Sequence, residues 1–540
     1  MKIIKNILGF SIATLLLLGC TENFEELNTK PDVILADNLD IGLLGQAFAN
    51  AQMRSMTGAP GGGAGNFQLA QSLFSDLYSQ YFANTATNFD SDRHIQVGGW
   101  SNGVWSYFYG QTAPIIKFVE DFTAENELPL ENAFAKVLKV HAYHRYTDYF
   151  GPIIYSEFGN AETSVAYDTQ EFIYRDLFRV LDEAVAVLKQ NQGAQAFAAH
   201  DQVFGGSADK WLTYANSLRL RLAMRVKYVD RSLSQSEAEK AVADGVMMSN
   251  DDNAEVATTI NSRHPYWTIT NWGEFRMSAL MESVLTGYED PRLPIYFSPA
   301  ADYVDSGEGQ PYRGLRNGLP RGALDQGALN RAYSDLGVRW LNQGRGGSAS
   351  GPPFRMMCAA EVYFLRAEGV LEGWAMGSGS ARELYEKGVE MSMTESRIGA
   401  DMDAVEEYLS RTLSPDPVTY PENPSWNLAA PTSVPVAFMD GADLETQLEQ
   451  IITQKWLAIF PDGWEAWAEL RRTKYPRPFP RVSSDNVDVP RDMVLRRLVF
   501  VEGEYNNNRE AVEAAEELPE LTSRGGNTNA TKLWWDAKPE

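Results

Sequence analysis

The sequence predicts a mainly α-helical protein in which about four helical hairpins are separated by long, loop-rich insertions. Apolar side chains recur every three or four residues in several segments, which is the spacing of one helix face. A plan of helix, turn and helix recurs along the chain. No alternation of apolar and polar residues persists long enough to indicate a large sheet. These three observations together favour a repeat-built helical body.

The clearest hairpin joins residues 171–188 to residues 208–226. Tyr174, Leu177 and Leu181 fall on one face of the first segment, and Trp211 begins a similar face in the second. A connection rich in Gln, Gly and Ala separates the two segments. The spacing therefore predicts two helices that return on each other.

Other segments follow the same plan. A helix over residues 359–374 is expected to end near Gly373, where a Gly/Ser turn leads to a second helix over 377–393. Further helices are expected over 104–121, 132–150 and 444–460. A unit length of about 34 residues with mixed small and aromatic side chains is typical of tetratricopeptide units. The predicted fold class is therefore mainly α, with tetratricopeptide-like hairpins.

The first residues predict export and lipid attachment. Lys2 and Lys5 precede a short apolar run, which is typical of a signal peptide and too short for a membrane span of about 20 residues. The run ends in Leu-Leu-Gly before Cys20, which resembles a bacterial lipobox, and the alternative is a plain signal peptide with an incidental cysteine. We expect lipid on Cys20, with the body held at a membrane.

The chain is expected to have three parts. We expect a lipoprotein signal peptide over residues 1–19, a lipidated tether over 20–40 and a single body over 41–540. Within the body, Gly, Pro and aromatic residues punctuate three loop-rich insertions, at about 58–105, 251–350 and 411–436. In a helical repeat protein such insertions often form the binding face.

The charge balance excludes some classes of partner. The chain has 47 Lys and Arg against 72 Asp and Glu, a formal net charge of −25. A general nucleic-acid binder needs a basic face for the phosphates, so no nucleic-acid partner is expected. Attachment to anionic lipid through a polybasic patch is also disfavoured.

Residues that often carry chemistry receive structural interpretations. Cys358 lies in an apolar helical run and is expected to be a small core residue. His141 and His144 are expected to be packed helix residues, and no metal site is predicted. The run 251–253, Asp-Asp-Asn, could hold a structural calcium ion, but a turn or helix cap is favoured. No cofactor is expected.

One carboxylate pair is a candidate for catalysis. A glycoside hydrolase needs two carboxylates about 5–10 Å apart. Glu465 and Glu469 lie at a helical spacing of four between tryptophans. A structural position on the surface is the favoured interpretation, and no enzyme activity is predicted.

Several blocks of the chain, in one order, resemble the SusD/RagB family of outer-membrane nutrient-binding lipoproteins. The resemblance begins at Cys20 with its acidic tail, and its most specific block is residues 204–225. The other blocks are residues 145–152, 288–293, 359–374 with Tyr385 and Gly388, 451–476, 495–508 and 534–536.

The resemblance implies a localisation, a partner and a function. Members of the family are lipid-anchored in the outer membrane, face the cell exterior and bind without cleaving. The resemblance implies a SusC-like TonB-dependent barrel transporter as partner, with this chain acting as a hinged lid that delivers an oligosaccharide or, in some members, a peptide. Most family blocks are then scaffold, and residues 290–292 are expected to set a turn and a buried ion pair.

Candidate ligand contacts are sought in the insertions, where packing does not already occupy the side chains. An aromatic ring can cover the C–H face of a sugar while polar side chains meet its hydroxyl groups. The predicted ligand-binding residues are Asn84, Asn88, Asp90, Trp100, Trp267, Trp272, Arg276 and Trp340. Trp100, Trp272 and Trp340 are the expected platforms, and the alternative for each is a core aromatic that anchors a loop.

Three functions remain open at this point. The first is nutrient binding for a transporter, with an oligosaccharide as the favoured ligand and a peptide as the alternative. The second is a surface glycoside hydrolase. The third is a lid needed for transporter assembly that has little affinity for ligand.

Overall fold

The computed structural model describes residues 41–57 and 63–539. It divides into two units, residues 1–46 and 47–540, and of the first only residues 41–46 are described, as the start of helix α3 (Ile41–Ser55). The predicted signal peptide, the lipidation site at Cys20 and the tether over 20–40 lie outside the described residues. The helices and strands after α3 all belong to the second unit.

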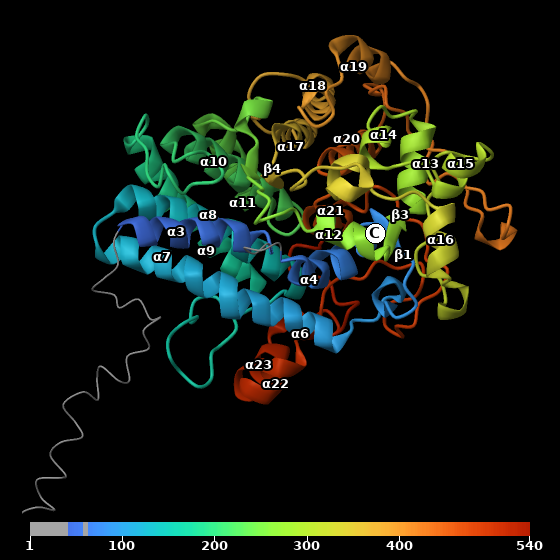
Figure 1. The fold of residues 1–540 in the computed structure, drawn as a ribbon. Helices are drawn as coiled ribbons and strands as arrows, with labels where there is room; N and C mark the ends of the chain where they lie inside the picture. The colour runs from blue at the N-terminus through green and yellow to red at the C-terminus, as the bar shows by residue number, and fades with distance from the viewer. Residues whose placement is uncertain (1–40, 58–62, 540) are drawn as a thin grey trace, which may run out of the picture. The chain divides into compact units, whose positions relative to one another are not determined.

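Helices pack in sequence through the first half of the second unit. They are α7 (Ala113–Glu125), α8 (Pro129–Phe150), α9 (Gln170–Gln190), α10 (Ala208–Arg225) and α11 (Arg231–Asp244). Each contacts the next along the chain, and Figure 1 shows α7, α8 and α9 running alongside one another. The side chains of Thr169 and Ser207 accept hydrogen bonds from the first-turn amides of α9 and α10, which fixes where both helices begin.

A second set of helices follows the same plan. It comprises α17 (Ala359–Leu371), α18 (Ala381–Thr394), α19 (Met402–Leu409), α20 (Leu444–Ala458) and α21 (Gly463–Thr473). Helix α17 packs against both α18 and α20. The approach to α18 is close, because a Cβ atom at Gly388 would lie 2.8 Å from the ring of Phe364. The prediction of a mainly helical fold with repeated hairpins is confirmed.

The remaining elements are short. Before α7 come α4 (Ala64–Phe67), the π-helix η2 (Gln68–Ser75), α5 (Asp76–Tyr78), β1 (Phe82–Asn84), η3 (Asp90–Arg93), α6 (Gly98–Tyr107) and η4 (Phe108–Thr112). Between α11 and α17 come η5 (Asn250–Asp252), β2 (Ala254–Val256), α12 (Tyr266–Trp272), β3 (Phe275–Met277), α13 (Ala279–Gly287), α14 (Leu293–Tyr296), α15 (Ala301–Ser306), η6 (Arg321–Ala323), α16 (Gln326–Ala332), η7 (Val338–Trp340), η8 (Gln343–Arg345) and β4 (Phe354–Met357). Between α19 and α20 comes η9 (Pro424–Trp426), and near the C-terminus come α22 (Glu502–Asn507), α23 (Arg509–Glu516) and α24 (Pro519–Thr522).

Strands are few among the described residues. Strand β1 pairs antiparallel with β3, so that Asn84 lies opposite Phe275, and β2 pairs antiparallel with β4. Each sheet has two strands. No helix among the described residues combines the length and apolar character that a membrane span requires.

The expected insertions contain more structure than predicted. Residues 64–78 form a nearly continuous helical run whose Phe67, Leu73, Phe74 and Leu77 are buried in the core. Glycines near the start of this run suggested a loop, but the apolar side chains that follow them recur at helical spacing and find core partners. The segment from 251 to 350 is likewise interrupted by short helices.

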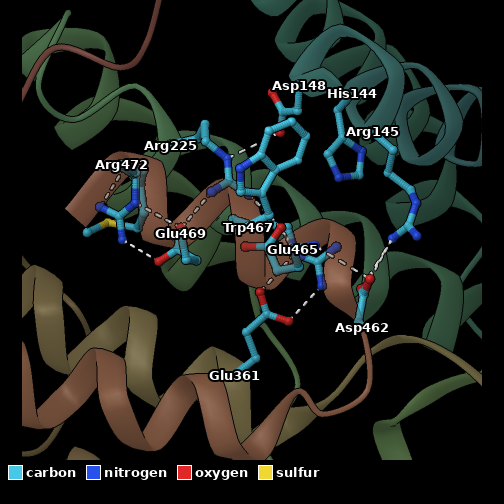
Figure 2. A network of polar contacts seen from close by, with 12 residues as sticks. His144, Arg145, Asp148, Arg225, Glu361, Asp462, Glu465, Trp467, Glu469 and Arg472 are labelled. Atoms are coloured by element: carbon cyan, nitrogen blue, oxygen red, sulfur yellow. Dashed lines mark hydrogen bonds and ion pairs between the residues drawn. The ribbon is translucent and has the colours of Figure 1, made fainter. Parts of the chain in front are cut away.

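The interpretation of Glu465 and Glu469 as surface residues is wrong. Both lie on α21 and are buried, at 3% and 4% exposure. Figure 2 shows Arg225 of α10 between them, at 2.5 Å from Glu465 and 2.6 Å from Glu469. Charged residues at this spacing are typical of a helix face exposed to solvent. Here that face of α21 packs against neighbouring helices, whose cations pair with both glutamates.

These residues belong to what we call the buried charge network: Asp148, Arg221, Arg225, Glu361, Glu368, Lys455, Glu465, Glu469 and Arg472. Burial alone would raise the pKa of Glu465, but Arg225, Lys455 and Arg221 outweigh it and lower the pKa to about 2. Removing one cation from such a site leaves a buried charge without compensation. The network therefore joins α8, α10, α17, α20 and α21.

The other structural interpretations agree with the structure. The Asp290 and Arg292 side chains are fully buried and 2.6 Å apart, as predicted for a turn with an ion pair. Cys358 and both helix histidines are buried. Asp252 accepts the backbone N–H of Ser249 and closes a capping box on η5, which is the favoured cap role.

Candidate functional site

The eight predicted ligand-binding residues differ in their exposure. Trp272 is 39% exposed at the end of α12, and Asn88 is also exposed. Trp100, Trp267 and Asp90 are partly exposed. Asn84, Arg276 and Trp340 are buried. The tryptophans Trp100, Trp267 and Trp272 sit on short helices, although the sequence placed them in loops.

One of these tryptophans, Trp100, belongs to an apolar patch that is partly exposed. Leu69, Trp100 and Phe275 are partly buried and pack on a small core cluster around Phe89. The ring of Phe89 lies 5.3 Å from Trp100 and 5.8 Å from Phe275, between centroids. Trp272 precedes Phe275 by three residues. We call Leu69, Trp100, Trp272 and Phe275 the aromatic surface.

Backbone contacts hold Trp272 at this surface. Gln326 of α16 donates from Nε2 to the carbonyl oxygens of Trp272 and Gly273, at 3.0 Å each. Thr85 donates from its hydroxyl to the carbonyl oxygen of Gly273 at 2.7 Å. Gly273 has a φ of 66°, and a Cβ atom there would lie 2.5 Å from Nδ2 of Asn330. The turn after Trp272 therefore requires glycine, and its hydrogen bonds hold the backbone of Trp272 in place.

Polar side chains border the aromatic surface. Gln68 donates a hydrogen bond to the carboxylate of Glu274, and burial raises the pKa of Glu274 above its ordinary value. Asn271, on the last turn of α12, accepts a hydrogen bond from Asn342 and is exposed. Together with Asn88, these groups offer donors and acceptors beside apolar rings. Such a combination suits a ligand with C–H faces and hydroxyl edges.

Two predicted residues already have strong partners. The indole N–H of Trp267 donates to the carbonyl oxygen of Ser348 at 2.8 Å, and the Arg263 guanidinium lies 4.1 Å from the ring centroid. The carboxylate of Asp90 pairs with Arg321 and Arg93, and the hydrogen bond from Arg321 lowers its pKa. Both side chains are less available to a ligand than Trp272.

The three buried residues have structural contacts and present no open face. Asn84 donates to the carbonyl oxygens of Ala86 and Phe89, at 2.8 and 3.1 Å, and so shapes the loop beneath Phe89. Arg276 donates to the carbonyl oxygens of Phe275 and Asn330. Trp340 is 1% exposed and packs edge-on against Phe460 in the core. Trp340 therefore lies where the alternative interpretation places it, as an aromatic residue of the core.

Sequence reasoning missed Leu69, Gln68 and Phe89. Leu69 and Gln68 lie on the π-helix η2, and nothing in the pattern separates them from the core residues of the same run. Phe89 gives no signal of its own because it lies between the polar Asn88 and Asp90. The pairing of β1 with β3 places Asn84 opposite Phe275, and the hydrogen bond from Gln68 to Glu274 joins η2 to the same segment. Neither of these contacts has a signal in the sequence.

The described residues offer no obvious catalytic arrangement. Arg225 and Arg472 enclose the closely spaced pair Glu465 and Glu469 (Figure 2). Lys455 adds a third cation, at 3.2 Å from Glu465 and 3.3 Å from Glu469. Substrate could not reach these carboxylates without disrupting the ion pairs. No group of three or more His, Cys, Asp or Glu side chains among the described residues is arranged to hold a metal ion.

Comparison with protein families gives one match over most of the chain. The family model described as SusD-like, Susd and RagB outer membrane lipoprotein, matches residues 24–536. Members of this family bind nutrients and are not catalytic. A comparison with curated protein sequences found no match.

Solved structures give the same result. A chitin-binding SusD homologue from Flavobacterium johnsoniae is 33% identical, with a TM-score of 0.82 over 92% of this chain and 99% of that one. A SusD homologue from Bacteroides vulgatus is 33% identical, with a TM-score of 0.81 over 91% and 97%. A SusD homologue from Bacteroides thetaiotaomicron is 32% identical, with a TM-score of 0.80 over 93% and 100%.

Proposed function

Because this chain belongs to the SusD/RagB family of outer-membrane nutrient-binding lipoproteins, we propose that it captures an oligosaccharide on the aromatic surface and delivers it to a SusC-like TonB-dependent transporter. In this proposal the helical body acts as a lid on the barrel, anchored to the membrane through lipid on Cys20 and facing the cell exterior. The ligand contacts are Trp100 and Trp272, with Asn88 at the edge.

The observation that carries the proposal is the exposure of Trp272 on a fixed backbone. An indole that is 39% exposed keeps apolar area in contact with water, which costs free energy until a ligand covers it. Covering one such ring with the C–H face of a sugar contributes about 1–3 kcal/mol. Because the backbone of Trp272 is already held by Gln326 and Thr85, little conformational entropy is lost on binding.

The relative from Flavobacterium johnsoniae guides the choice of sugar. It binds chitin, shares 33% of its residues with this chain and is covered almost completely. Oligomers of N-acetylglucosamine are therefore the first ligands to test. The acetamide groups of such a ligand suit the amide and carboxylate side chains at the border, Gln68, Asn88 and Glu274.

Calorimetry with a glycan panel tests the proposal. We expect one glycan class to bind, and we expect Trp272→Ala and Trp100→Ala to weaken binding by about tenfold or more, which is about 1.4 kcal/mol. Phe172→Ala is the matched control, because Phe172 is 47% exposed on α9 and lies outside the aromatic surface. Absence of heat with every glycan, or equal affinity in all three variants, contradicts the proposal.

The transporter partner is tested separately. A pull-down on the full lipidated chain from outer membranes should recover a large barrel protein. Variants Trp272→Ala and Trp100→Ala should still recover that barrel while nutrient uptake falls. Uptake that is unchanged in these variants would favour a lid that serves assembly alone.

A further inference from the structure

A pocket of about 400 Å³ shares no lining residue with the aromatic surface. Its walls come from α13, from α15 with the loop after it, and from the Pro-rich loop between α19 and α20. The volume falls within the range of about 300–1,000 Å³ that small-molecule sites occupy. Neither the family's scaffold role nor the proposed glycan contacts account for it.

Hydrogen bonds fix the walls of this pocket before any ligand enters. The N–H of Asp416 donates to the carbonyl oxygen of Ser283 at 2.9 Å, and the Ser283 hydroxyl donates to the carbonyl oxygen of Asp416 at 2.5 Å. The contact is close, since a Cβ atom at Gly287 would lie 2.3 Å from the Asp416 nitrogen. Tyr420 donates to the carbonyl oxygen of Gly314 at 2.7 Å. The Pro-rich loop is thus tied to α13 and to the loop after α15.

The lining is strongly negative. Its carboxylates are Glu282, Asp302, Glu308, Asp416 and Glu422. Among the described residues of the lining, Arg313 is the one cation, and it donates to Glu422 at 2.6 Å while lying 4.9 Å from the ring centroid of Tyr333. Asp302 pairs at 2.9 Å with Arg331, which lies outside the lining. Glu282, Glu308 and Asp416 still give the cavity a field that attracts positive charge.

Glu282 is the least exposed acid of the pocket, since the other four acids of the lining are exposed. Its Oε2 atom accepts the N–H of Gly314 at 2.5 Å, and its Oε1 atom accepts no hydrogen bond from any residue that the structure describes. Burial raises the pKa of Glu282 to about 7, Asp416 and Glu422 act in the same direction, and the Gly314 N–H and Arg313 act against it. Near neutral pH this carboxyl therefore holds a proton for much of the time, which a cationic ligand would displace.

The arrangement of the lining carboxylates indicates which kind of cation the pocket would bind. The described acids are not grouped as a metal ion requires, so a compact divalent ion lacks a converging ligand set. Tyr303 and Tyr312 add aromatic rings to the lining, which attract an organic cation as well as an apolar surface. A molecule with one ammonium group and a polar body fits both features.

We propose that this pocket binds the ammonium group of a small polar molecule, such as a sugar carrying a primary amine, with Glu282 as its counter-ion. The ammonium meets Oε1 of Glu282, and the carboxyl releases its proton to water as the ion pair forms. The tyrosine rings and the backbone of residues 309–310 border the rest of the ligand. This site does not depend on glycan binding at the aromatic surface.

Calorimetry with 6-amino-6-deoxyglucose as probe and glucose as its neutral match tests the proposal. We expect the amine to bind at least about tenfold more tightly than glucose. Affinity should rise as the pH increases from about 5.5 to about 8, because Glu282 ionises over this range while the alkyl ammonium stays charged. Titrations in buffers of different ionisation heat should show a proton released on binding. Equal binding of the two sugars, or no binding of the amine, overturns the proposal.

Two variants assign the effect to this pocket. Glu282→Gln mimics the protonated acid, so the fold should persist, while amine affinity falls about tenfold or more and proton release disappears. Glu289→Gln is the matched control, since Glu289 is exposed just after α13 and lies outside the lining. Trp272→Ala should bind the amine normally, which separates failure here from failure of the glycan proposal. An unchanged amine affinity in Glu282→Gln, or displacement of the amine by an equimolar amount of calcium, overturns the assignment.

Discussion

In the buried charge network Arg225 lies 2.5 and 2.6 Å from two carboxylates and is fully buried, whereas Trp272 of the aromatic surface and Asn88 at its border remain open to water. Both regions are assembled from segments far apart in the chain. In the first, every charged side chain pairs with an opposite charge from the same protein. In the second, Trp272 and Asn88 keep surface that no residue described by the structure covers. The scaffold and the proposed binding site therefore differ in how far the protein's own groups already contact each side chain, and not in residue type.

The largest expected effect comes from breaking the network. Arg225→Met should lower the free energy of unfolding by about 3–5 kcal/mol, because Glu465 and Glu469 lose the nearer of two shared cations in a buried position. Urea unfolding followed by circular dichroism measures it. The control is Arg175→Met, since the Arg175 side chain is 47% exposed and its pairs with Glu171 and Asp230 contribute at most about 1 kcal/mol. Equal losses in the two variants would contradict the contrast.

A pair of tryptophans sharpens the comparison. Trp340→Ala should cost about 3–5 kcal/mol of stability, because Trp340 is 1% exposed and its removal leaves a cavity beside Phe460. Trp272→Ala should change stability by about 0.5 kcal/mol or less while it weakens glycan binding. Thermal unfolding and calorimetry on both variants measure the two effects. A large loss of stability in Trp272→Ala would place that ring in the scaffold.

The acid-lined pocket predicts a dependence of stability on pH. Because burial raises the pKa of Glu282 from 4.5 to about 7, the unfolded state releases its proton first as the pH rises. Stability attributable to this carboxyl is therefore present below about pH 4.5 and is lost as the pH rises through about 7. Glu282→Gln should unfold at a higher temperature than the parent protein at about pH 8 and at a similar temperature at about pH 4.5. If the difference in unfolding temperature between Glu282→Gln and the parent protein does not change with pH, the pKa of Glu282 is not raised.

The smallest expected effect concerns the support of the aromatic surface. Thr85→Val keeps the side-chain shape but removes the hydrogen bond to the carbonyl oxygen of Gly273, which still accepts one from Gln326. We expect a loss of about 0.5–1.5 kcal/mol in stability and a fall of a few-fold in glycan affinity. Unfolding and calorimetry on the same sample measure both. Normal affinity would mean that Gln326 alone holds Trp272 in place.

Much of the helical body could be predicted from local patterns. Helix periodicity identified the segments around α9, α10, α17 and α18, because each buries one face and the spacing of that face is fixed by helix geometry. The ion pair of Asp290 and Arg292 was also accessible, since both partners lie in one short turn. Helices and contacts within one turn depend on residues close together in the chain, so a single sequence is enough to predict them.

The binding surface could be predicted only in part. Trp100 and Trp272 are aromatic residues near glycines in segments of weak periodicity, which made them visible as candidates. Trp340 shares that description and is buried, since its surroundings are set by Phe460, which lies 120 positions further along the chain. The surface interpretation of Glu465 and Glu469 failed for the same reason, because the cations that bury them come from other helices. Contacts between segments far apart in the chain determine how exposed these side chains are, and such contacts cannot be predicted from a single sequence.

The hydrogen bonds that hold the turn after Trp272 have a consequence for the rate of ligand binding. Gln326 of α16 and Thr85, which follows β1, both donate hydrogen bonds to this turn, so the backbone that carries the indole does not need to rearrange. Encounter with a ligand then needs no slow ordering step, and association should be similarly fast for every sugar that fits. Selectivity among nutrients would be expressed in how long each one stays, which sets the time available for the barrel to take it up.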